Sequence, residues 1–216
     1  MALAWHHSVN PNTEIALWKI EEEAEDLYGR LRLRDSEKAH LEKLKSSKRH
    51  LHWLGTRVLL RELIGTREYI NCVSDKNGKP YLVDLPYSIS FSHSFDYAGV
   101  MISREQECGL DIELIKDKVV RIAGKFLQPE EQAFIDRNHE TEHISACWCA
   151  KEAVYKCYGK REISFLNHIF LQTFPYRSEG GQMNIRIEND HILNYYEGHY
   201  LSFDGYMIGY VTDNEF

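Results

Sequence analysis

Apolar residues recur at spacings of three and four over residues 36–64, a pattern that predicts amphipathic helices. The recurring residues are Leu41, Leu44, Leu51, Trp53, Leu54, Val58, Leu59, Leu60 and Leu63. Gly65 follows this run and suits a helix end, because glycine tolerates the left-handed backbone found there. The polar side of the region is strongly basic, with Lys38, Lys43, Lys45, Lys48, Arg49, Arg57 and Arg61.

Three further helices are predicted from their starts and ends. The acidic run Glu21–Asp26 favours a helix, because carboxylates stabilise the positive N-terminus of a helix. Pro129 suits the first turn of another helix in the segment Phe126–Glu131. A longer helix is expected from about Glu142 to Cys157, with Gly159 near its end.

The other apolar segments are short or alternating and are separated by turn residues, which predicts strands. They are expected at residues 15–20, 89–94, 97–103, 108–114, 163–174, 182–188, 199–203 and 206–212, and an extended segment is expected to begin at Pro80. The turn signals are Asn77-Gly78, Glu179-Gly180-Gly181 and Asp204-Gly205. Residues 89–94 and 97–103 are separated by only two residues, so they predict a hairpin, and the whole pattern predicts an antiparallel α+β fold.

The two ends of the chain contain similar stretches, which suggests an internal repeat. Trp53, Arg57 and Arg61 have the same spacing as Trp148, Glu152 and Lys156. The predicted strand at residues 97–103 also resembles the one at residues 206–212. The sequence therefore predicts two similar α+β halves, an N-terminal half over residues 1–108 and a C-terminal half over residues 109–216.

Composition narrows the class of protein. A chain of 216 residues with 43% hydrophobic content can bury a sizeable core. Its apolar runs are far shorter than the roughly 18 residues of a membrane span, and no secretory signal is recognisable, so a cytoplasmic protein is expected. The net charge of −7 argues against general nucleic-acid binding. The five cysteines have no zinc-knuckle spacing and are expected to be reduced, mostly buried thiols.

Two carboxylates interrupt an apolar strand in the middle of the chain. Asp111 and Glu113 lie two residues apart, so their side chains share one side of the predicted strand. Leu110, Ile112 and Leu114 are then expected to face the core. Buried charge is costly unless it is paired or bound to a metal, so this strand is a candidate for chemistry.

A second charged pair lies on the predicted long helix. Glu152 and Lys156 stand four residues apart, on the same face as Trp148. If Asp111, Glu113 and Glu152 converge, their carboxylates repel one another, and Mg²⁺ would offset that repulsion while keeping positions for water and phosphate oxygens. For each residue taken alone, an ordinary surface salt bridge is the alternative interpretation.

Basic residues elsewhere are suited to bind phosphate groups beside such a metal. They are Lys79, His93, Lys156 and the arginines of the basic helical region. Arg57 and Arg61 share a helix face with Trp53, and a guanidinium near an apolar anchor usually binds a carboxylate or a phosphate.

Five motifs follow one another along the chain. They are Asn77-Gly78-Lys79-Pro80, Ser90-Phe91-Ser92-His93-Ser94, Gly109-Leu110-Asp111-Ile112-Glu113, Phe126–Glu131, and Trp148-Cys149-Ala150-Lys151-Glu152-Ala153-Val154-Tyr155-Lys156. In this order they resemble the motifs of the Sfp-type (surfactin-synthetase-activating) 4'-phosphopantetheinyl transferases. The resemblance covers most of the chain, although the first 35 and last 50 residues match only in general character. It implies a pseudo-two-fold monomer of two α+β halves, with coenzyme A and magnesium in the cleft between them.

The resemblance also implies a reaction. The hydroxyl of a serine in an apo acyl or peptidyl carrier protein attacks the β-phosphate of coenzyme A, 4'-phosphopantetheine is transferred and 3',5'-ADP leaves. By position, Asp111, Glu113 and Glu152 resemble the magnesium ligands, and Lys156 resembles the residue that steadies the pyrophosphate. Glu152 is also the general-base candidate, directly or through a metal-bound water.

Further residues resemble coenzyme A contacts by position. They are Lys79, Ser92 and His93, with His93 near the 3'-phosphate. Arg49 and Arg57 match basic residues of the family more loosely and are expected to contact phosphate. Family members often have a second glycine after the long helix, whereas Gly159 is followed by Lys160-Arg161-Glu162, so the next loop is expected to differ.

Two other functions remain open, and the carrier is not specified. A magnesium-dependent phosphohydrolase could use the same three carboxylates without a carrier protein. A coenzyme A-binding regulator could retain the site without transfer activity. No motif distinguishes a fatty-acid, polyketide or nonribosomal-peptide carrier, and the basic run Lys43–Arg49 is either a docking surface for an acidic carrier or a solvated face.

Overall fold

The computed structural model describes residues 3–213, which group into two compact units. The first unit contains residues 3–73 and 80–105, and the second contains residues 74–79 and 106–213. The short segment 74–79 therefore groups with the later part of the chain. Within the described residues no helix is long and apolar enough to cross a membrane.

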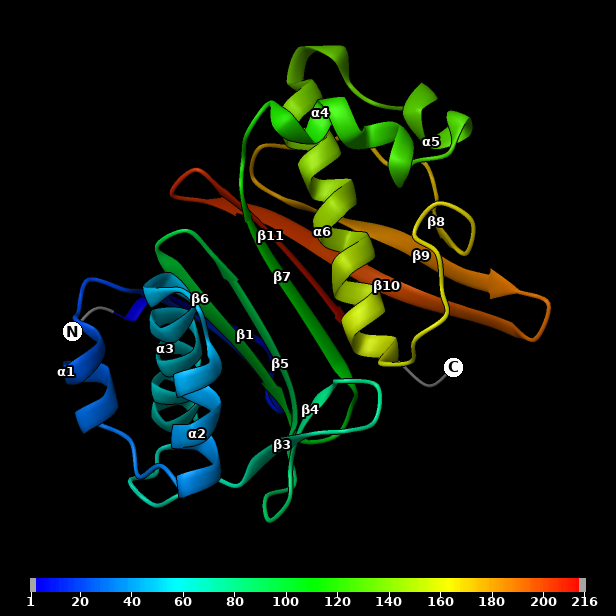
Figure 1. The fold of residues 1–216 in the computed structure, drawn as a ribbon. Helices are drawn as coiled ribbons and strands as arrows, with labels where there is room; N and C mark the ends of the chain where they lie inside the picture. Colours follow the sequence, from blue (N-terminus) through cyan, green and yellow to red (C-terminus); the bar gives the residue numbers. More distant parts are fainter. Residues whose placement is uncertain (1–2, 214–216) are drawn as a thin grey trace. The chain divides into compact units, whose positions relative to one another are not determined.

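The first unit contains one antiparallel sheet and three helices (Figure 1). Its four sheet strands, in spatial order, are β1 (Leu3–Asn10), β2 (Thr13–Lys19), β6 (Tyr97–Ser103) and β5 (Ser88–Ser94). Its helices are α1 (Ala24–Gly29), α2 (Asp35–Lys43) and α3 (Ser47–Ile64). Two short strands, β3 (Cys72–Ser74) and β4 (Pro80–Leu82), pair separately with each other.

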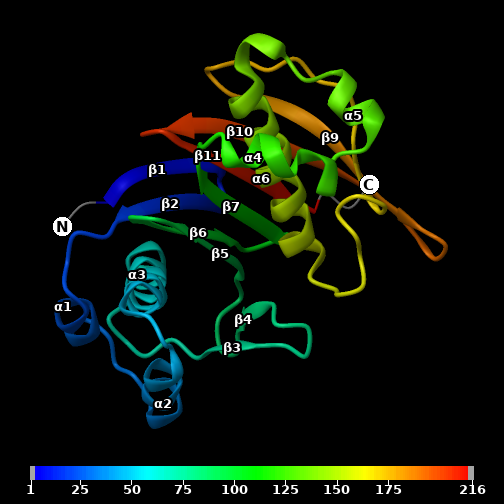
Figure 2. The ribbon, with the colours of Figure 1, turned by 45° about the horizontal axis from the view of Figure 1, so that its top comes forward.

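Helix α3 covers one face of this sheet. It begins after Ser46, whose hydroxyl accepts a hydrogen bond from the Arg49 N–H at 3.2 Å, and it ends at Gly65 with a φ of +71°. Leu54, Val58 and the residues beside them are buried against β2 and β6. Figure 2 shows α3 nearly end-on beneath the sheet, with α1 and α2 on its other side. The predicted helical region and its glycine stop are confirmed.

The second unit contains a five-stranded antiparallel sheet with one long helix against it (Figure 1). The strands, in spatial order, are β7 (Cys108–Leu114), β11 (Tyr206–Thr212), β10 (Ile192–Phe203), β9 (Gly181–Asn189) and β8 (Ile169–Leu171). The α-helices are α4 (Lys118–Ile122), α5 (Pro129–Ala133) and α6 (Glu140–Tyr158), with single 3₁₀ turns at Ala123–Lys125 and Arg137–His139. The α+β class is confirmed, while the two-fold relation between halves stays a prediction.

The predicted strand at residues 163–174 is wrong over most of its length, because only Ile169–Leu171 is a strand. Before it, the chain makes a turn in which the Ser164 N–H donates to His168 Nδ1 at 2.9 Å and the His168 N–H donates to the Ser164 carbonyl at 2.8 Å. Polar side chains that bond to nearby backbone compete with strand pairing. Such a turn satisfies the backbone locally and delays the strand.

The strand expected at residues 199–203 is longer than predicted. It begins at Ile192 and pairs along its length with β9, through a turn that the sequence pattern did not indicate. In that turn the His191 N–H donates to Asn189 Oδ1 at 2.9 Å. This side-chain bond forms the hairpin without a glycine or proline, which is why the turn signals missed it.

Two glycines let α6 approach the sheet closely. A Cβ atom on Gly109 of β7 would lie 1.9 Å from the Ala153 carbonyl oxygen, and one on Gly209 of β11 would lie 2.7 Å from the Cys149 carbonyl carbon. No side chain fits at these separations, so only glycine permits this contact between backbone and backbone. The short distance brings the charged side chains of β7 and α6 together.

We expect Gly109→Ala to lower the free energy of unfolding by about 1–3 kcal/mol or more, because the added methyl group overlaps the backbone of α6. Urea unfolding followed by circular dichroism measures the change. Gly29→Ala at the end of α1 is the matched control, since a Cβ atom there meets nothing within 4 Å. Equal stability of the two variants would show that α6 can move away from β7 at no cost.

Candidate active site

Asp111 and Lys156 form the centre of a charged cluster in the second unit. Lys156 Nζ on α6 donates to Asp111 Oδ1 on β7 at 2.7 Å and to the Leu110 carbonyl at 2.9 Å. Asp111 is only 4% exposed, whereas the Lys156 side chain is 27% exposed. A charge-assisted bond between such groups is stronger than a surface ion pair. The lysine is therefore fixed at the edge of the cluster while part of it still reaches solvent.

The carboxylates of β7 lie on the side of the strand that α6 covers. Gly109 points at α6, and Asp111 and Glu113 share its side because side chains alternate along a strand. Of the three residues expected to face the core, Leu110 and Ile112 are fully buried, whereas Leu114 is half-buried. The carboxylate side is covered too, so β7 from Cys108 to Ile112 is buried on both sides.

Glu152 on α6 belongs to the same cluster. Burial raises the pKa of Glu152 to about 7, and the Asp111 carboxylate is the next largest cause. Lys156 lowers this pKa, and Glu113 raises it further. Three carboxylates thus act on one another with a single lysine among them, which is an excess of negative charge in a partly buried place.

These oxygen donors fit a hard divalent cation such as Mg²⁺ in their chemistry. Over residues 3–213, however, no three His, Cys, Asp or Glu side chains form a group that could hold a metal ion as they stand. Asp111 Oδ1 is bonded to Lys156 instead. The magnesium ligand set of Asp111, Glu113 and Glu152 stays a prediction that the charge of the cluster supports.

We expect the metal-free protein to lose stability as the pH rises from about 4.5 to about 7, through Glu152. The folded pKa lies above the ordinary value of 4.5, so the folded state binds more protons than the unfolded state in this window. Glu152→Gln cannot ionise and should gain stability relative to the parent between pH 5 and pH 8. Urea unfolding of both proteins in EDTA measures the difference, and a difference that is constant with pH would contradict the assignment.

Lys79 lies at the C-terminal end of α6. Its Nζ donates to the Cys157 carbonyl at 2.6 Å and bonds to the Glu107 carboxylate. A second contact joins the same loop to the chain after α6, where Arg161 Nε donates to the Asn77 carbonyl at 2.8 Å. A cation is favourable at a helix C-terminus, so Lys79 has a structural partner in addition to its predicted coenzyme A contact.

The other predicted contacts lie in the first unit. Ser92 and His93 are neighbours on β5, where Ser92 is buried and His93 is exposed. Arg49 is exposed in the first turn of α3, a position at which a cation opposes the helix dipole. Their predicted roles toward coenzyme A stay predictions.

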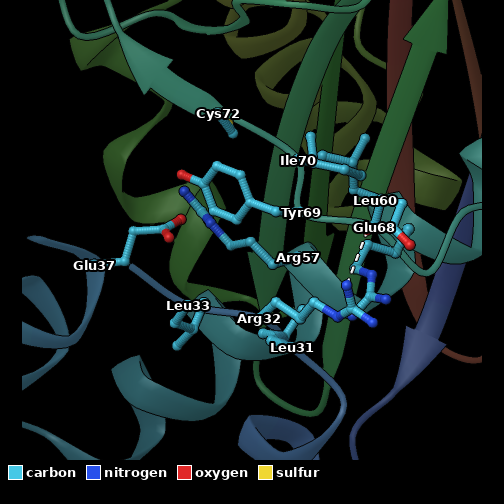
Figure 3. Close-up of a pocket in the computed structure, with 11 residues that line it drawn as sticks. Leu31, Arg32, Leu33, Glu37, Arg57, Leu60, Glu68, Tyr69, Ile70 and Cys72 are labelled. Carbon is cyan, nitrogen blue, oxygen red and sulfur yellow. Dashed lines mark hydrogen bonds and ion pairs between the residues drawn. The ribbon is translucent and has the colours of Figure 1, made fainter. Parts of the chain in front are cut away.

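Arg57 lies in a pocket of the first unit (Figure 3). Its guanidinium carbon is 4.2 Å from the centre of the Trp53 ring and 4.9 Å from that of Phe91, as in cation–π contacts. Figure 3 shows the side chain passing alongside Tyr69 and pointing toward Glu37. Burial lowers the pKa of Arg57, and the charge of Glu37 opposes this.

Arg61 instead donates to two backbone carbonyls, those of Arg30 and Arg67.

A buried ion pair beside the cluster had no predicted role. Lys151 is fully buried, and its Nζ donates to Glu131 Oε2 at 2.8 Å and to the carbonyls of Phe126, Phe165 and Ile169 at 2.7, 3.1 and 2.6 Å. The Glu131 carboxylate also accepts from the N–H groups of Gln128 and Leu171, both at 2.7 Å. Lys151 and Glu131 both lie within the sequence motifs. That position is the only feature of the sequence that could have indicated a role for them.

The five cysteines are reduced, and four of them are buried. Cys108, Cys147, Cys149 and Cys157 are buried thiols, and Cys72 is half-buried. Burial raises the pKa of Cys149, and the nearby carboxylates raise it further. A thiol kept protonated in this way is a poor nucleophile.

Comparison with known proteins places this cluster in a family. Residues 107–211 match the 4'-phosphopantetheinyl transferase superfamily. A Synechocystis sp. protein that is provisionally named a 4'-phosphopantetheinyl transferase is 28% identical over 145 residues, which is 61% of this chain and 58% of that protein. The 4'-phosphopantetheinyl transferase AcpT of Salmonella typhimurium is 30% identical over 51% of this chain and 60% of its own length. A 4'-phosphopantetheinyl transferase of Bacillus subtilis is 31% identical over 38% of each chain.

The matches thus span about three fifths or less of the length of these curated relatives. The matched region contains β7, α6 and the whole charged cluster between them. Residues 107–211 of this chain therefore resemble the 4'-phosphopantetheinyl transferase superfamily, as the sequence motifs predicted.

Proposed function

We propose that this protein transfers the 4'-phosphopantetheine arm of coenzyme A to a serine of an apo carrier protein. The observation that carries the proposal is the cluster of β7 and α6. It combines the Asp111–Lys156 pair, at 2.7 Å, with a Glu152 whose pKa burial raises to about 7. This cluster lies within the region that matches the family. The family resemblance supplies the substrate class.

In the proposed reaction the serine oxygen forms a bond to the β-phosphorus of coenzyme A. The bond from that phosphorus to the oxygen of the departing 3',5'-ADP breaks. Glu152 accepts the proton of the serine hydroxyl. In the metal-free protein burial raises the pKa of Glu152 to about 7, a value matched to a base that works at neutral pH. Lys156 stabilises the charge on the pyrophosphate as it is cleaved.

Asp111, Glu113 and Glu152 are proposed to hold Mg²⁺. The ion would neutralise charge on the phosphate oxygens when bound. The roles of Lys79, Ser92, His93, Arg49 and Arg57 are to bind coenzyme A. In this arrangement the protein contributes mainly alignment and charge, which are the main requirements of phosphoryl transfer.

Mass spectrometry of an apo carrier protein tests the proposal directly. The carrier is mixed with this protein, coenzyme A and MgCl₂, and it should gain the mass of the phosphopantetheine arm. Acyl and peptidyl carriers should be tested separately, because the sequence does not specify one. A mixture with EDTA in place of MgCl₂ is the control and should show little transfer.

Two negative results would identify the alternatives. Tight binding of coenzyme A without modification of any carrier would indicate a coenzyme A-binding regulator. Release of inorganic phosphate from small phosphate esters without a carrier would indicate a phosphohydrolase. Either result would overturn the transferase proposal.

A further inference from the structure

We propose that His52 of α3 is a positioning residue for His93. Its ring lies against the His93 imidazole and holds that ring, together with the turn between β5 and β6, in the orientation that meets the 3'-phosphate of coenzyme A. The inference rests on the proposed function, in which His93 contacts coenzyme A. All the residues involved belong to the first unit.

The two imidazole rings are stacked. Their centres are 4.3 Å apart, and their planes differ by 14°. His52 is only 7% exposed, whereas His93 is exposed at the end of β5. One face of the outer ring is thus covered by a buried ring from a helix, which restricts rotation of the outer side chain.

His52 also fixes the turn that follows His93. Its Nε2 is 2.7 Å from the Phe95 carbonyl oxygen. A carbonyl only accepts, so Nε2 carries the hydrogen. Phe95 has a φ of +47°, which is unusual for a residue with a side chain and needs support from its surroundings. One turn earlier on α3, Lys48 Nζ lies 4.7 Å from the Phe95 ring centre and 3.8 Å from Asp96 Oδ1.

Small residues allow α3 to come close enough for this contact. Gly55 lies three positions after His52, and a Cβ atom there would be 3.4 Å from Ala98 Cβ and 3.1 Å from Ile20 Cδ1. Ala98 is the partner of His93 in the pairing of β5 with β6. The helix and the hairpin therefore meet where the two histidines stack.

A buried histidine that bonds a carbonyl can also serve packing alone. His50 supplies the matched case, because it lies on the same helix and its Nε2 is 2.6 Å from the Leu41 carbonyl oxygen of α2. Like His52, it forms a hydrogen bond to a backbone carbonyl, but that carbonyl belongs to α2 and not to the turn between β5 and β6. A loss of coenzyme A recognition on changing His52, without the same loss on changing His50, separates positioning from packing.

The test measures affinity for coenzyme A and for dephospho-coenzyme A, which lacks the 3'-phosphate, by isothermal titration calorimetry with MgCl₂ present. The proteins are the parent, His52→Leu, His52→Phe and His50→Leu. We expect the parent to bind coenzyme A more tightly than dephospho-coenzyme A. In His52→Leu the ratio of the two affinities should fall roughly three- to tenfold, the range of an aromatic stacking contact. Affinity for dephospho-coenzyme A should stay unchanged. His52→Phe keeps the stacked ring but loses the bond to the Phe95 carbonyl, so it should retain part of the preference, whereas His50→Leu should retain all of it.

An unchanged preference in His52→Leu, or equal weakening of both ligands, would overturn the inference. If His52→Leu does not fold, His52→Phe provides the test. A preference of His52→Phe for coenzyme A over dephospho-coenzyme A as low as that of a His93→Ala variant would contradict positioning by stacking. If the parent protein binds coenzyme A and dephospho-coenzyme A equally well, His93 does not contact the 3'-phosphate. That result would also overturn the inference. Failure of transfer to carriers, with the His52 effect intact, would contradict only the proposed function.

Discussion

Replacing Asp111 with asparagine should lower the rate of carrier modification by about 10²–10³-fold, the loss typical when one charge-stabilising group is removed from an active site. The variant keeps the size of the side chain but removes the charge that binds Lys156 at 2.7 Å. It also removes the largest neighbouring charge that raises the pKa of Glu152. Two changes are therefore expected together, a slower reaction and, in the metal-free protein, a lower pKa of Glu152.

Two measurements check this, the initial rate of carrier modification at saturating coenzyme A and MgCl₂, and urea unfolding as a function of pH in EDTA. In EDTA, the pH window in which the protein loses stability through Glu152 should move to lower pH in Asp111→Asn, because Glu152 then ionises more easily. Glu130→Gln is the matched control, since Glu130 is an exposed carboxylate on α5 outside the cluster. Far-UV circular dichroism should show the same fold in all three proteins. A full rate in Asp111→Asn would show that the cluster is not the site of transfer.

The long helices and the charged positions on β7 and α6 were predictable because their causes are local. Apolar spacing marked α3, and a glycine marked the end of both α3 and α6. Gly65 and Gly159 have φ values of +71° and +67°. Asp111 and Glu152 stood out because each interrupts an apolar stretch. Sequence spacing also indicated which side of β7 carries both carboxylates, since side chains alternate along any strand.

The role of Gly109 and the partners of His52 depend on contacts between distant segments. Gly109 reads as an ordinary strand glycine, and only the position of Ala153 shows why no larger residue fits there. His52 reads as one of several histidines in a basic helix, and the Phe95 carbonyl that it bonds lies 43 residues later. Local pattern cannot indicate such pairings, because they arise from the packing of helix on sheet.

Lys151 is the clearest case of a residue whose role the sequence conceals. It precedes Glu152 on α6, and a lysine in that position usually reaches solvent. In the structure it is fully buried, and burial lowers its pKa. Its four acceptors come from three other segments, around residues 126–131, 165 and 169. The lysine therefore joins α6 to the segments that surround it.

Lys151→Met should lower the free energy of unfolding by about 3–5 kcal/mol, because it leaves the buried Glu131 without its counter-charge. Three backbone carbonyls would also lose their donor. Lys151→Met with Glu131→Gln should recover part of this loss, since the uncompensated charge is gone. Urea unfolding of the parent, Lys151→Met, Glu131→Gln and the double variant completes a double-mutant cycle, which measures the coupling free energy between the two residues.

Lys156→Met is the matched control on the same helix. Its loss should slow transfer strongly. It also leaves the buried Asp111 without its counter-charge, but Lys156 is 27% exposed and bonds one backbone carbonyl rather than three, so the free energy of unfolding should fall less than in Lys151→Met. The two lysines lie five residues apart but would thus separate into one that holds the fold and one that acts on the substrate. If Lys151→Met stopped transfer without lowering the free energy of unfolding, Lys151 would have a chemical role, and the division between the two lysines would be wrong.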